Sequence, residues 1–254
     1  MLFEFMNFEE FIKWYSELGK LKIFWAKPIE SIELLNKESN LYLVSIKWVA
    51  KSKIKNAILA ITETQDGASK IIELLRKYCD SVKLLMVPED TSMNLGLVNA
   101  NSLLYLWKVN AKTLEPNRNV SIKTFSEWDE NDIETFKNIH KQSWGFFIPP
   151  RNRDHIVIVA YLNNLAVGMG YLNIHNFNID YGIHVIKSYW RKRIGTALLT
   201  KILELAKSMG TSYVSVVRVF RSVKGTSSDI RAVKFYRANN PSVKMLVYKL
   251  NDKM

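Results

Sequence analysis

Residues 179–209 read IDYGIHVIKSYWRKRIGTALLTKILELAKSM, and this stretch constrains the fold more than any other part of the chain. A β-branched apolar run is followed by a basic turn around Gly195, and the turn opens directly into an amphipathic helix. The first amides of a helix have no partner within the helix, and the helix dipole adds partial positive charge there. A strand, a turn and a helix N-terminus in this order therefore make an anion site. Because Arg191, Lys192 and Arg193 lie in the turn, we expect a polyphosphate ligand.

The positive charge of the chain is concentrated in the half that contains this turn. The formal net charge is +12. Residues 1–115 carry 15 Lys and Arg against 14 Asp and Glu, whereas residues 116–254 carry 21 against 10. This asymmetry fits a polyanionic ligand bound by the C-terminal half. Charge alone leaves nucleic acid open as a partner, because basic surface is common to all polyanion-binding proteins.

The composition predicts a globular protein of one or two domains. The chain has 254 residues, of which 48% are hydrophobic and 24% are charged. It has no apolar run near the roughly 18 residues that a membrane-spanning helix needs, and the acidic residues in MLFEFMNFEEFIKWY argue against a signal peptide. The single cysteine, Cys79, excludes an internal disulfide and a cysteine-built metal site, and we expect it to be packed at a helix end. We therefore expect a cytoplasmic protein that binds no metal.

Residues 1–115 are predicted to form a smaller α/β domain. Helices are expected over 7–19 and 67–78, and strands over 41–50, 56–62, 82–87 and 103–109. The lysine-rich segment KSKIK between the first two strands reads as a turn. Proline and polar residues in LEPNRN interrupt the pattern near residues 114–119, which places the domain boundary there.

Residues 116–254 give a second α/β pattern. Strands are expected over 120–125, 155–162 and 165–174, in the stretch that starts at 179, and over 213–219 and 243–250. One or two helices are expected over 127–144, another follows the turn around Gly195 and ends near 209, and a last one begins at about 229. Asn163 and Asn164 are expected to form a tight turn, because asparagine tolerates positive φ. The order β, α, β, β, β, α, β, α, β predicts a mixed sheet with helices on its faces.

This order, with a phosphate turn after the fourth strand, resembles the GCN5-related N-acetyltransferase (GNAT) family over residues of about 120–250. The hairpin VIVAYLNNLAVGMGYL looks like the second and third strands of the family, VIKSYWRKRIGTALL like its acyl-CoA motif, and DIRAVKFYRANNP like its last helix. The resemblance implies an acetyl-CoA-dependent N-acetyltransferase. It also implies that the pantetheine arm bonds to the main chain of a splayed strand, at Ile183, His184 and Val185.

The acyl-CoA motif departs from the usual pattern Q/R-x-x-G-x-G/A at two positions. Gly195 falls on the second glycine, whereas Arg193 stands at the first glycine and Trp190 at the Gln or Arg. We expect Arg193 to keep a negative φ, with its amide toward the phosphate and its side chain outward. The other CoA-binding residues that the resemblance implies are Arg191, Lys192, Arg193, Ile194, Gly195, Thr196, Ala197, Asp229, Ala232 and Tyr236.

Acyl transfer from a thioester to an amine requires a deprotonated amine, a hydrogen-bond donor at the carbonyl and a proton for the leaving thiolate. The resemblance makes Tyr236 the candidate general acid. On a helix, Asp229, Ala232, Val233 and Tyr236 share one face, and Ala232 leaves room for the pantetheine arm. The alternative is that Phe235 and Tyr236 are simply an aromatic pair in the core.

His184 is the candidate general base, because its ordinary pKa of about 6.5 suits that task. Asp180 and His175 compete with it, and a packed histidine or a substrate amine that arrives neutral are the alternatives. Cys79 is the only cysteine and lies in the other half, so we expect direct transfer in a ternary complex.

Three further groups leave alternatives open. The aromatic residues Trp144, Phe146 and Phe147 either line an apolar acceptor pocket or fill the domain interface. The N-terminal half is either a degenerate acetyltransferase-like domain or an unrelated α/β cap. The basic residues of the last loop and helix either hold the 3′-phosphate of CoA or an acidic acceptor, or form a solvated face: Arg218, Arg221, Lys224, Arg231, Lys234 and Arg237.

The sequence therefore predicts an α/β protein in which a smaller domain, residues 1–115, precedes a GNAT-like catalytic domain, residues 116–254. The predicted activity is transfer of an acetyl group from acetyl-CoA to an amine. The alternative is a weak or inactive GNAT-fold protein whose basic domain binds nucleic acid or an acidic partner. No membrane partner is expected, and the acceptor and the choice between monomer and homodimer stay open.

Overall fold

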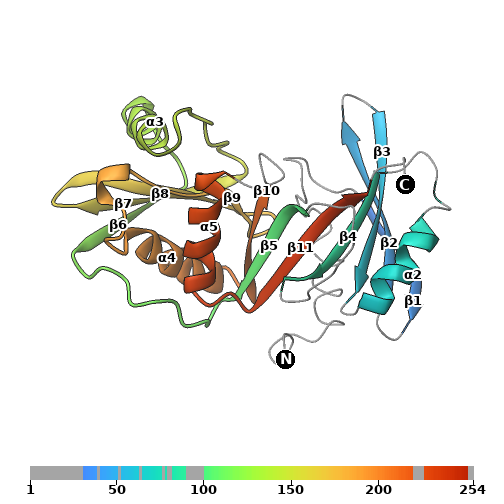
Figure 1. The fold of residues 1–254 in the computed structure, drawn as a ribbon. Helices are drawn as coiled ribbons and strands as arrows, with labels where there is room; N and C mark the ends of the chain where they lie inside the picture. The colour runs from blue at the N-terminus through green and yellow to red at the C-terminus, as the bar shows by residue number, and fades with distance from the viewer. Residues whose placement is uncertain are drawn as a thin grey trace. The chain divides into compact units, whose positions relative to one another are not determined.

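The computed structural model describes residues 31–38, 41–50, 53–62, 65–75, 78, 82–89, 100–219 and 226–250. The chain forms two compact units, each built from separate segments (Figure 1). Unit 1 comprises residues 1–105, 218–229 and 243–254, and unit 2 comprises residues 106–217 and 230–242. Unit 1 includes the last strand of the chain, which pairs with β4. The predicted domain limits, 1–115 and 116–254, stay a prediction. The predicted helix over 7–19 and Cys79 lie outside the described residues.

Unit 1 contains a mixed sheet with the strand order β1-β2-β3-β4-β11-β5. β1, β2 and β3 pair antiparallel as consecutive strands, and β3 pairs parallel with β4 through the crossover helix α2. β11 then pairs antiparallel with β4. The elements are β1 (Ser31–Glu38), β2 (Leu41–Ala50), β3 (Lys53–Thr62), α2 (Gln65–Leu75), β4 (Val82–Pro88), β5 (Ala100–Lys108) and β11 (Val243–Leu250).

No strand was predicted over β1, and the predicted turn KSKIK was too long, because its last three residues belong to β3. Residues 53–55 continue β3, which pairs with β2 as far as Ala50 and Lys53. Ile54 is 70% exposed there, so this strand end presents an apolar side chain to solvent. A solvated strand end lacks the apolar periodicity by which a strand is predicted.

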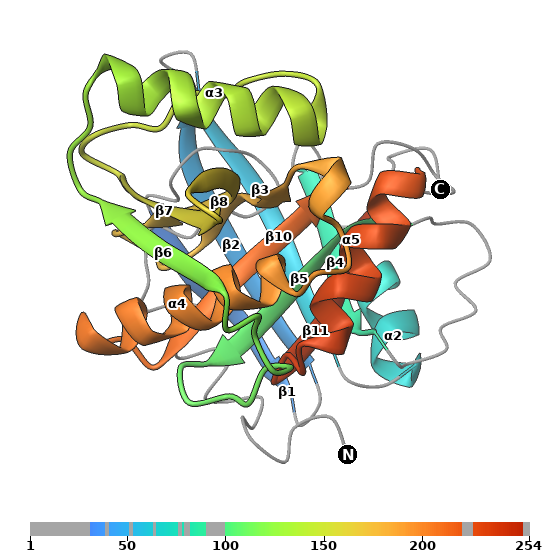
Figure 2. The same cartoon turned by 90° about the vertical axis from the view of Figure 1, so that its left-hand side faces the viewer.

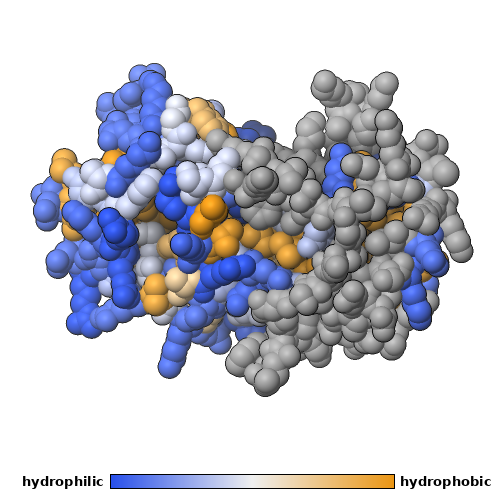
Figure 3. Space-filling model, viewed as in Figure 1, coloured by the Kyte–Doolittle hydropathy of each residue, from blue (hydrophilic) through white to orange (hydrophobic). Residues whose placement is uncertain are grey.

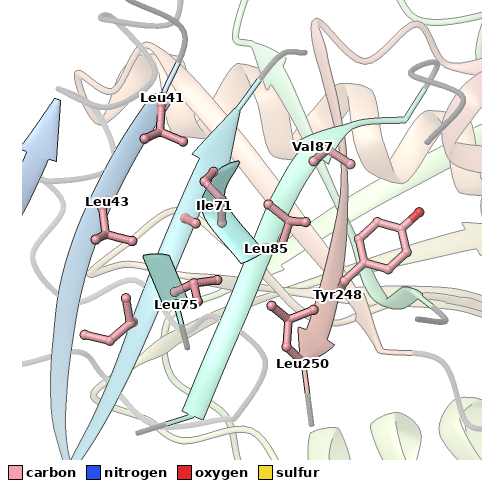
Figure 4. Packing of buried hydrophobic residues seen from close by; sticks show 10 residues of the cluster. Leu41, Leu43, Ile71, Leu75, Leu85, Val87, Tyr248 and Leu250 are labelled. Carbon is pink, nitrogen blue, oxygen red and sulfur yellow. The ribbon is translucent and has the colours of Figure 1, made fainter. Parts of the chain in front are cut away.

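The core of unit 1 lies between α2 and one face of this sheet (Figure 4). Ile71 and Leu75, four residues apart on α2, are both fully buried. They belong to one cluster with side chains from β2, β3, β4 and β11, among them Leu43, Leu85 and Leu250. This packing explains why the first and last parts of the chain share a unit.

Unit 2 contains an antiparallel sheet with the order β6-β7-β8-β9, covered by a helix on each face. Figures 1 and 2 both show α3 on one face of this sheet and α4 on the other. The elements are β6 (Val120–Phe125), α3 (Glu130–Trp144), β7 (His155–Leu162), β8 (Leu165–Asn173), β9 (Ile179–Val185), the 3-10 turn η1 (Lys187–Tyr189), α4 (Ile194–Ser208), β10 (Tyr213–Val219) and α5 (Ser227–Ala238), of which β10 ends and α5 begins in unit 1.

The tight turn and the first helix predicted for unit 2 are confirmed. Asn163 and Asn164 have φ values of 51° and 62°, which is the pair of positive values that a tight hairpin turn requires. A capping box of Asp129 and Asp132 begins α3, and Gly145, with a φ of 94°, ends it, so the predicted segment holds one helix. The predicted fold class, a mixed α/β protein, is confirmed.

β9 and β10 separate after a single contact. Asn178 and Ser215 form an isolated parallel bridge, and the amide of Ser215 donates to the carbonyl of Phe177. Beyond this bridge, among the described residues, β9 pairs with β8 alone. A bulge at Tyr181 and Gly182, both with positive φ, also shifts its register against β8. One edge of β9 is thus left open over its second half.

A buried polar network fixes the start of this opening. The carboxylate of Asp180, 5% exposed, accepts hydrogen bonds from His155 Nε2 (2.9 Å), Asn173 Nδ2 (3.0 Å) and Asn178 Nδ2 (2.8 Å). Ser215 Oγ in turn donates to Asn178 Oδ1 over 3.1 Å. The network therefore joins β8, β9 and β10 at the point where the last two strands separate.

Candidate active site

The open edge of β9 presents main-chain groups of Ile183 and Val185. The amide of Ile186 donates to the carbonyl of Val167, and the register places His184 opposite Met169. Main-chain groups alternate from one side of a strand to the other. His184 therefore bonds toward β8, while Ile183 and Val185 point to the open edge. Of the three positions at which the resemblance implies arm contacts, these two have the orientation such contacts need.

Tyr236, on α5, reaches this edge. Its hydroxyl accepts a hydrogen bond from the backbone N–H of Ile183 over 3.2 Å, and the side chain is 3% exposed. Its ring lies against Trp107 and Phe235, at centroid distances of 5.8 and 5.0 Å. A Cβ added at Gly182 would lie 2.9 Å from the hydroxyl, so the bulge glycine leaves the space that the phenol occupies. Tyr236 is thus both packed and placed at the edge.

The phosphate-type turn ends at Arg193, the N-cap of α4. Its φ of 56° and ψ of 20° are left-handed, so the expected negative φ was wrong. Arginine adopts here the conformation that glycine adopts without steric cost. The expectation that its side chain turns outward is confirmed, because Arg193 Nη1 donates to the carbonyl of Glu115 over 3.2 Å. The side chain of Arg193 makes no cap hydrogen bond to α4, so the first amides of this helix keep the donor capacity of an anion site.

Gly195 lies in the first turn of α4, where packing against α5 leaves no room for a side chain. A Cβ at Gly195 would lie 2.9 Å from Phe235 Cε2, so this glycine admits the aromatic ring of α5. The side chains of Ile194, Thr196 and Ala197 are buried. Any ligand contact from Ile194 or Thr196 is therefore made by the main chain, and the N–H of Ala197 already donates to the carbonyl of Arg193. Arg191 and Lys192 are exposed and can contribute charge.

Trp190 is a site residue that the sequence did not single out for a role. Its indole Nε1 donates to the carbonyl of Val185 over 2.8 Å, at the end of the open edge. The guanidinium of Arg231 lies 4.7 Å from the centroid of its ring. Trp190 is 37% exposed, so this stack lies at the surface. The departure from Gln or Arg at this position was the signal that could have found it.

Asp229 has a local role in the structure. Its carboxylate accepts hydrogen bonds from the amide and hydroxyl of Thr226, at 2.7 and 2.8 Å, and from Arg218, at 2.9 and 2.7 Å. Burial by itself raises the pKa of this carboxyl, but the bonds from Thr226 and Arg218 outweigh burial and the pKa is lowered. The residue caps the start of α5, and its contact with CoA stays a prediction.

His184 lies in an aromatic cluster between α3 and β9. Its Nε2 donates to the carbonyl of Tyr181 over 3.1 Å, and its Nδ1 lies 3.3 Å from Ser143 Oγ. Its ring centroid is 4.3 Å from that of His140 and 5.0 Å from that of Trp144. Both ring nitrogens thus have partners inside the protein, and a proton can reach His184 Nδ1 through the hydroxyl of Ser143.

His140 is a buried residue of this cluster that no sequence pattern indicated. It is fully buried, its Nδ1 accepts a hydrogen bond from the amide of Ile148, and its Nε2 has no partner among the described residues. Burial lowers its pKa to about 4, so the ring is neutral near pH 7. Two neutral rings, those of His140 and Trp144, therefore border His184.

The two competing base candidates lie elsewhere. Asp180 belongs to the buried network at the start of β9. His175 is exposed, and its Nε2 lies 3.0 Å from the carbonyl of Arg153 and 3.2 Å from Asp154 Oδ1. Of the three candidates, His184 is the one on the second half of β9, beside the open edge.

The aromatic residues after α3 continue the cluster around His184. Trp144 and Phe146 lie with ring centroids 4.0 Å apart, and Phe146 is 41% exposed. Phe147 packs against His140 at 5.6 Å. Their proposed roles, in an acceptor pocket or at a domain interface, stay predictions.

The surface of unit 2 is charged. Figure 3 shows hydrophilic residues over much of the face of this unit that is turned to the viewer. Arg231, Lys234 and Arg237 are exposed, whereas Arg218 is paired with Asp229, and residues 221 and 224 lie outside the described residues.

Within the described ranges no group of three His, Cys, Asp or Glu side chains could hold a metal ion. In those same ranges, no helix is long and apolar enough to cross a membrane.

Comparison with protein families confirms the resemblance. Residues 120–239 match the acetyltransferase (GNAT) family, and the chain therefore carries a GNAT acetyltransferase domain over this range. A comparison with curated proteins gives no match.

Several solved structures are similar to this chain. A GCN5-related N-acetyltransferase from Kribbella flavida has 12% identity and a TM-score of 0.46, over 84% of this chain and 88% of that chain. A functionally unknown conserved protein from Staphylococcus epidermidis has 16% identity and a TM-score of 0.44, over 86% and 94%. An aminoglycoside acetyltransferase from an uncultured soil metagenomic sample, in complex with sisomicin, has 21% identity and a TM-score of 0.39, over 51% and 92%.

Proposed function

We propose that this protein is an N-acetyltransferase that moves an acetyl group from acetyl-CoA to an amine by direct transfer in a ternary complex. The observation that carries the proposal is the position of Tyr236, whose buried hydroxyl bonds to Ile183 on the open edge of β9. A proton donor and an unpaired strand edge thus meet in the GNAT domain of the chain.

The residues present fit an acyl-CoA. An extended pantetheine arm pairs with a strand edge as an added strand does, and Ile183 and Val185 offer such an edge. The uncapped start of α4, with Arg191 and Lys192 exposed beside it, suits a pyrophosphate. The amides of residues 193–196 and the two cations would hold that group, because the N–H of Ala197 donates to the carbonyl of Arg193.

Tyr236 supplies the proton of the reaction. The amine attacks the thioester carbonyl, the carbon–sulfur bond breaks, and the phenol gives its proton to the departing thiolate. The N–H of Ile183 donates to the phenol oxygen, which stabilises the negative charge that this oxygen gains. His184 receives the proton of the amine through Ser143, which its Nδ1 contacts.

A thiol-release assay tests this function. Acetyl-CoA is offered with a panel of amines, including an amino acid, a polyamine, an aminoglycoside and a peptide N-terminus. We expect thiol release that depends on one class of amine and a melting temperature that rises with CoA. The absence of any melting-temperature shift with CoA would contradict the proposal.

A second candidate is a GNAT-fold protein that binds a nucleic acid or an acidic partner. The surplus of 21 basic over 10 acidic residues in positions 116–254 favours it. Its signature is an affinity for nucleic acid that falls steeply with salt, without thiol release. Measuring both thiol release and nucleic-acid affinity on one preparation therefore distinguishes the two functions.

A further inference from the structure

Two side chains form hydrogen bonds with main-chain groups at the open edge of β9. The edge presents four groups, the N–H and C=O of Ile183 and of Val185. Tyr236 takes the N–H of Ile183 at one end, and Trp190 takes the carbonyl of Val185 at the other. Within the described part of the chain, no hydrogen bond engages the remaining pair, the carbonyl of Ile183 and the N–H of Val185.

This remaining pair has the spacing of one rung in a parallel ladder. There, one residue of the added strand donates its N–H to the carbonyl of residue i−1 and accepts from the N–H of residue i+1. Ile183 and Val185 flank His184 in that relation. An extended chain with one N–H and one C=O in the right spacing therefore binds this edge in a single register.

Trp190 is held firmly in its position. It follows η1, whose amides at Tyr189 and Trp190 bond back to Ile186 and Lys187. The guanidinium of Arg231 covers its ring at 4.7 Å. A planar cation over an indole restricts the ring without using its N–H, which stays directed at Val185.

We propose that Trp190 is a positioning residue that sets the register of the pantetheine arm on β9. It acts by occupying the carbonyl of Val185, so that the arm has one acceptor, at Ile183, and not two. Without the indole N–H, an N–H of the arm can bind Val185 instead, two residues further along the strand. In that register the thioester lies away from Tyr236. This inference rests on the proposed function.

The variant Trp190→Phe tests the proposal, because it keeps an aromatic ring under Arg231 and removes the N–H alone. An arm that binds in two registers is held partly in an unproductive complex. Such binding lowers kcat and the KM for acetyl-CoA by the same factor and leaves kcat/KM unchanged. We expect kcat and the KM for acetyl-CoA each to decrease about fivefold, because this factor corresponds to the free energy of one hydrogen bond. Calorimetric titration with CoA is expected to show a Kd lower by the same factor.

Two companion variants sharpen the result. Trp190→Gln keeps an N–H donor at this position and is expected to restore kcat toward the wild-type value. Trp128→Phe removes a tryptophan that packs against Phe136, far along the chain from this edge, and is expected to leave kcat, KM and Kd at wild-type values.

The proposal is overturned if Trp190→Phe weakens CoA binding with kcat unchanged, which is the result of a merely structural role, or if it changes nothing. If the wild-type protein neither binds CoA in the titration nor releases thiol, the proposed function fails and this inference fails with it. Wild-type binding together with an unaffected Trp190→Phe overturns this inference alone.

Discussion

The phenol oxygen of Tyr236 lies 3.2 Å from the backbone nitrogen of Ile183, although 53 residues separate them in the chain. The bond joins α5 to the open edge of β9. Packing against Trp107 and Phe235 fixes the ring, so the oxygen position is set by the fold and not by a surface rotamer. A donor held in this way is suited to proton transfer at one point of the edge.

The variant Tyr236→Phe is expected to lower kcat by about 100-fold, the typical contribution of a general acid. The KM for acetyl-CoA should stay near the wild-type value, since the phenyl ring keeps its packing. The free energy of unfolding should fall by about 1 kcal/mol, because the amide of Ile183 loses its partner. Thiol-release kinetics and urea unfolding measure these effects. Tyr161→Phe, on β7, is the matched control, and a kcat within twofold of wild type for Tyr236→Phe would exclude the acid role.

The sequence predicts the parts of this structure that are set by local signals. The Asn163–Asn164 turn, the strand limits of β6, β7, β10 and β11, and the face of α5 that bears Tyr236 all follow from periodicity or from turn chemistry. The sites it failed to predict depend on contacts between distant segments. His140 acquires its surroundings from β9, and nothing adjacent to it in the sequence carries that information. Trp190 contacts β9 and α5, and the departure from Gln or Arg at its position is the local signal that could have found it.

The error at Arg193 has a different cause. The rule that non-glycine residues avoid positive φ predicted a negative value, yet φ is 56°. The turn geometry before α4 requires the left-handed conformation, and the surrounding fold imposes it on an arginine. The fold around this turn thus outweighs the preference of arginine for negative φ. The same turn carries the motif by which the domain was recognised.

Two substitutions at Arg193 measure the cost of this conformation. Both Arg193→Ala and Arg193→Gly remove the hydrogen bond to Glu115, but only glycine adopts positive φ without steric cost. Arg193→Gly is therefore expected to be more stable than Arg193→Ala by about 1 kcal/mol. Urea unfolding of the pair measures the difference. Equal stability would show that the left-handed turn carries no strain.

Stability is expected to depend on pH through His140. Burial lowers its pKa from 6.5 to about 4, so between these values the unfolded chain binds a proton that the folded protein does not. The free energy of unfolding therefore falls as the pH is lowered from about 6.5 toward 4, by about 3 kcal/mol in all for this residue. His140→Phe, which cannot be protonated, should reduce the slope of stability against pH in this window. Unfolding by urea at several pH values tests this, with His175→Gln as the control for loss of an exposed histidine, and an unchanged slope in His140→Phe would contradict it.

The contact between Gly195 and Phe235 predicts that substitutions at these two residues have non-additive effects on the free energy of unfolding. A Cβ at residue 195 would lie 2.9 Å from Cε2 and 3.2 Å from Cζ of the ring, so Gly195→Ala is expected to lower the free energy of unfolding by about 2 kcal/mol. Leucine lacks both of these ring atoms. In a Phe235→Leu background the same Gly195→Ala change should therefore cost about 1 kcal/mol less.

A double-mutant cycle in urea measures this coupling, and additive effects would show that the ring moves aside freely. The kinetics add a second readout, because Phe235 precedes Tyr236 on α5. If the clash in Gly195→Ala displaces the helix, kcat should fall with it and recover in the double variant. A loss of stability without a loss of kcat would show that the helix holds Tyr236 in place even when the ring beside it is displaced.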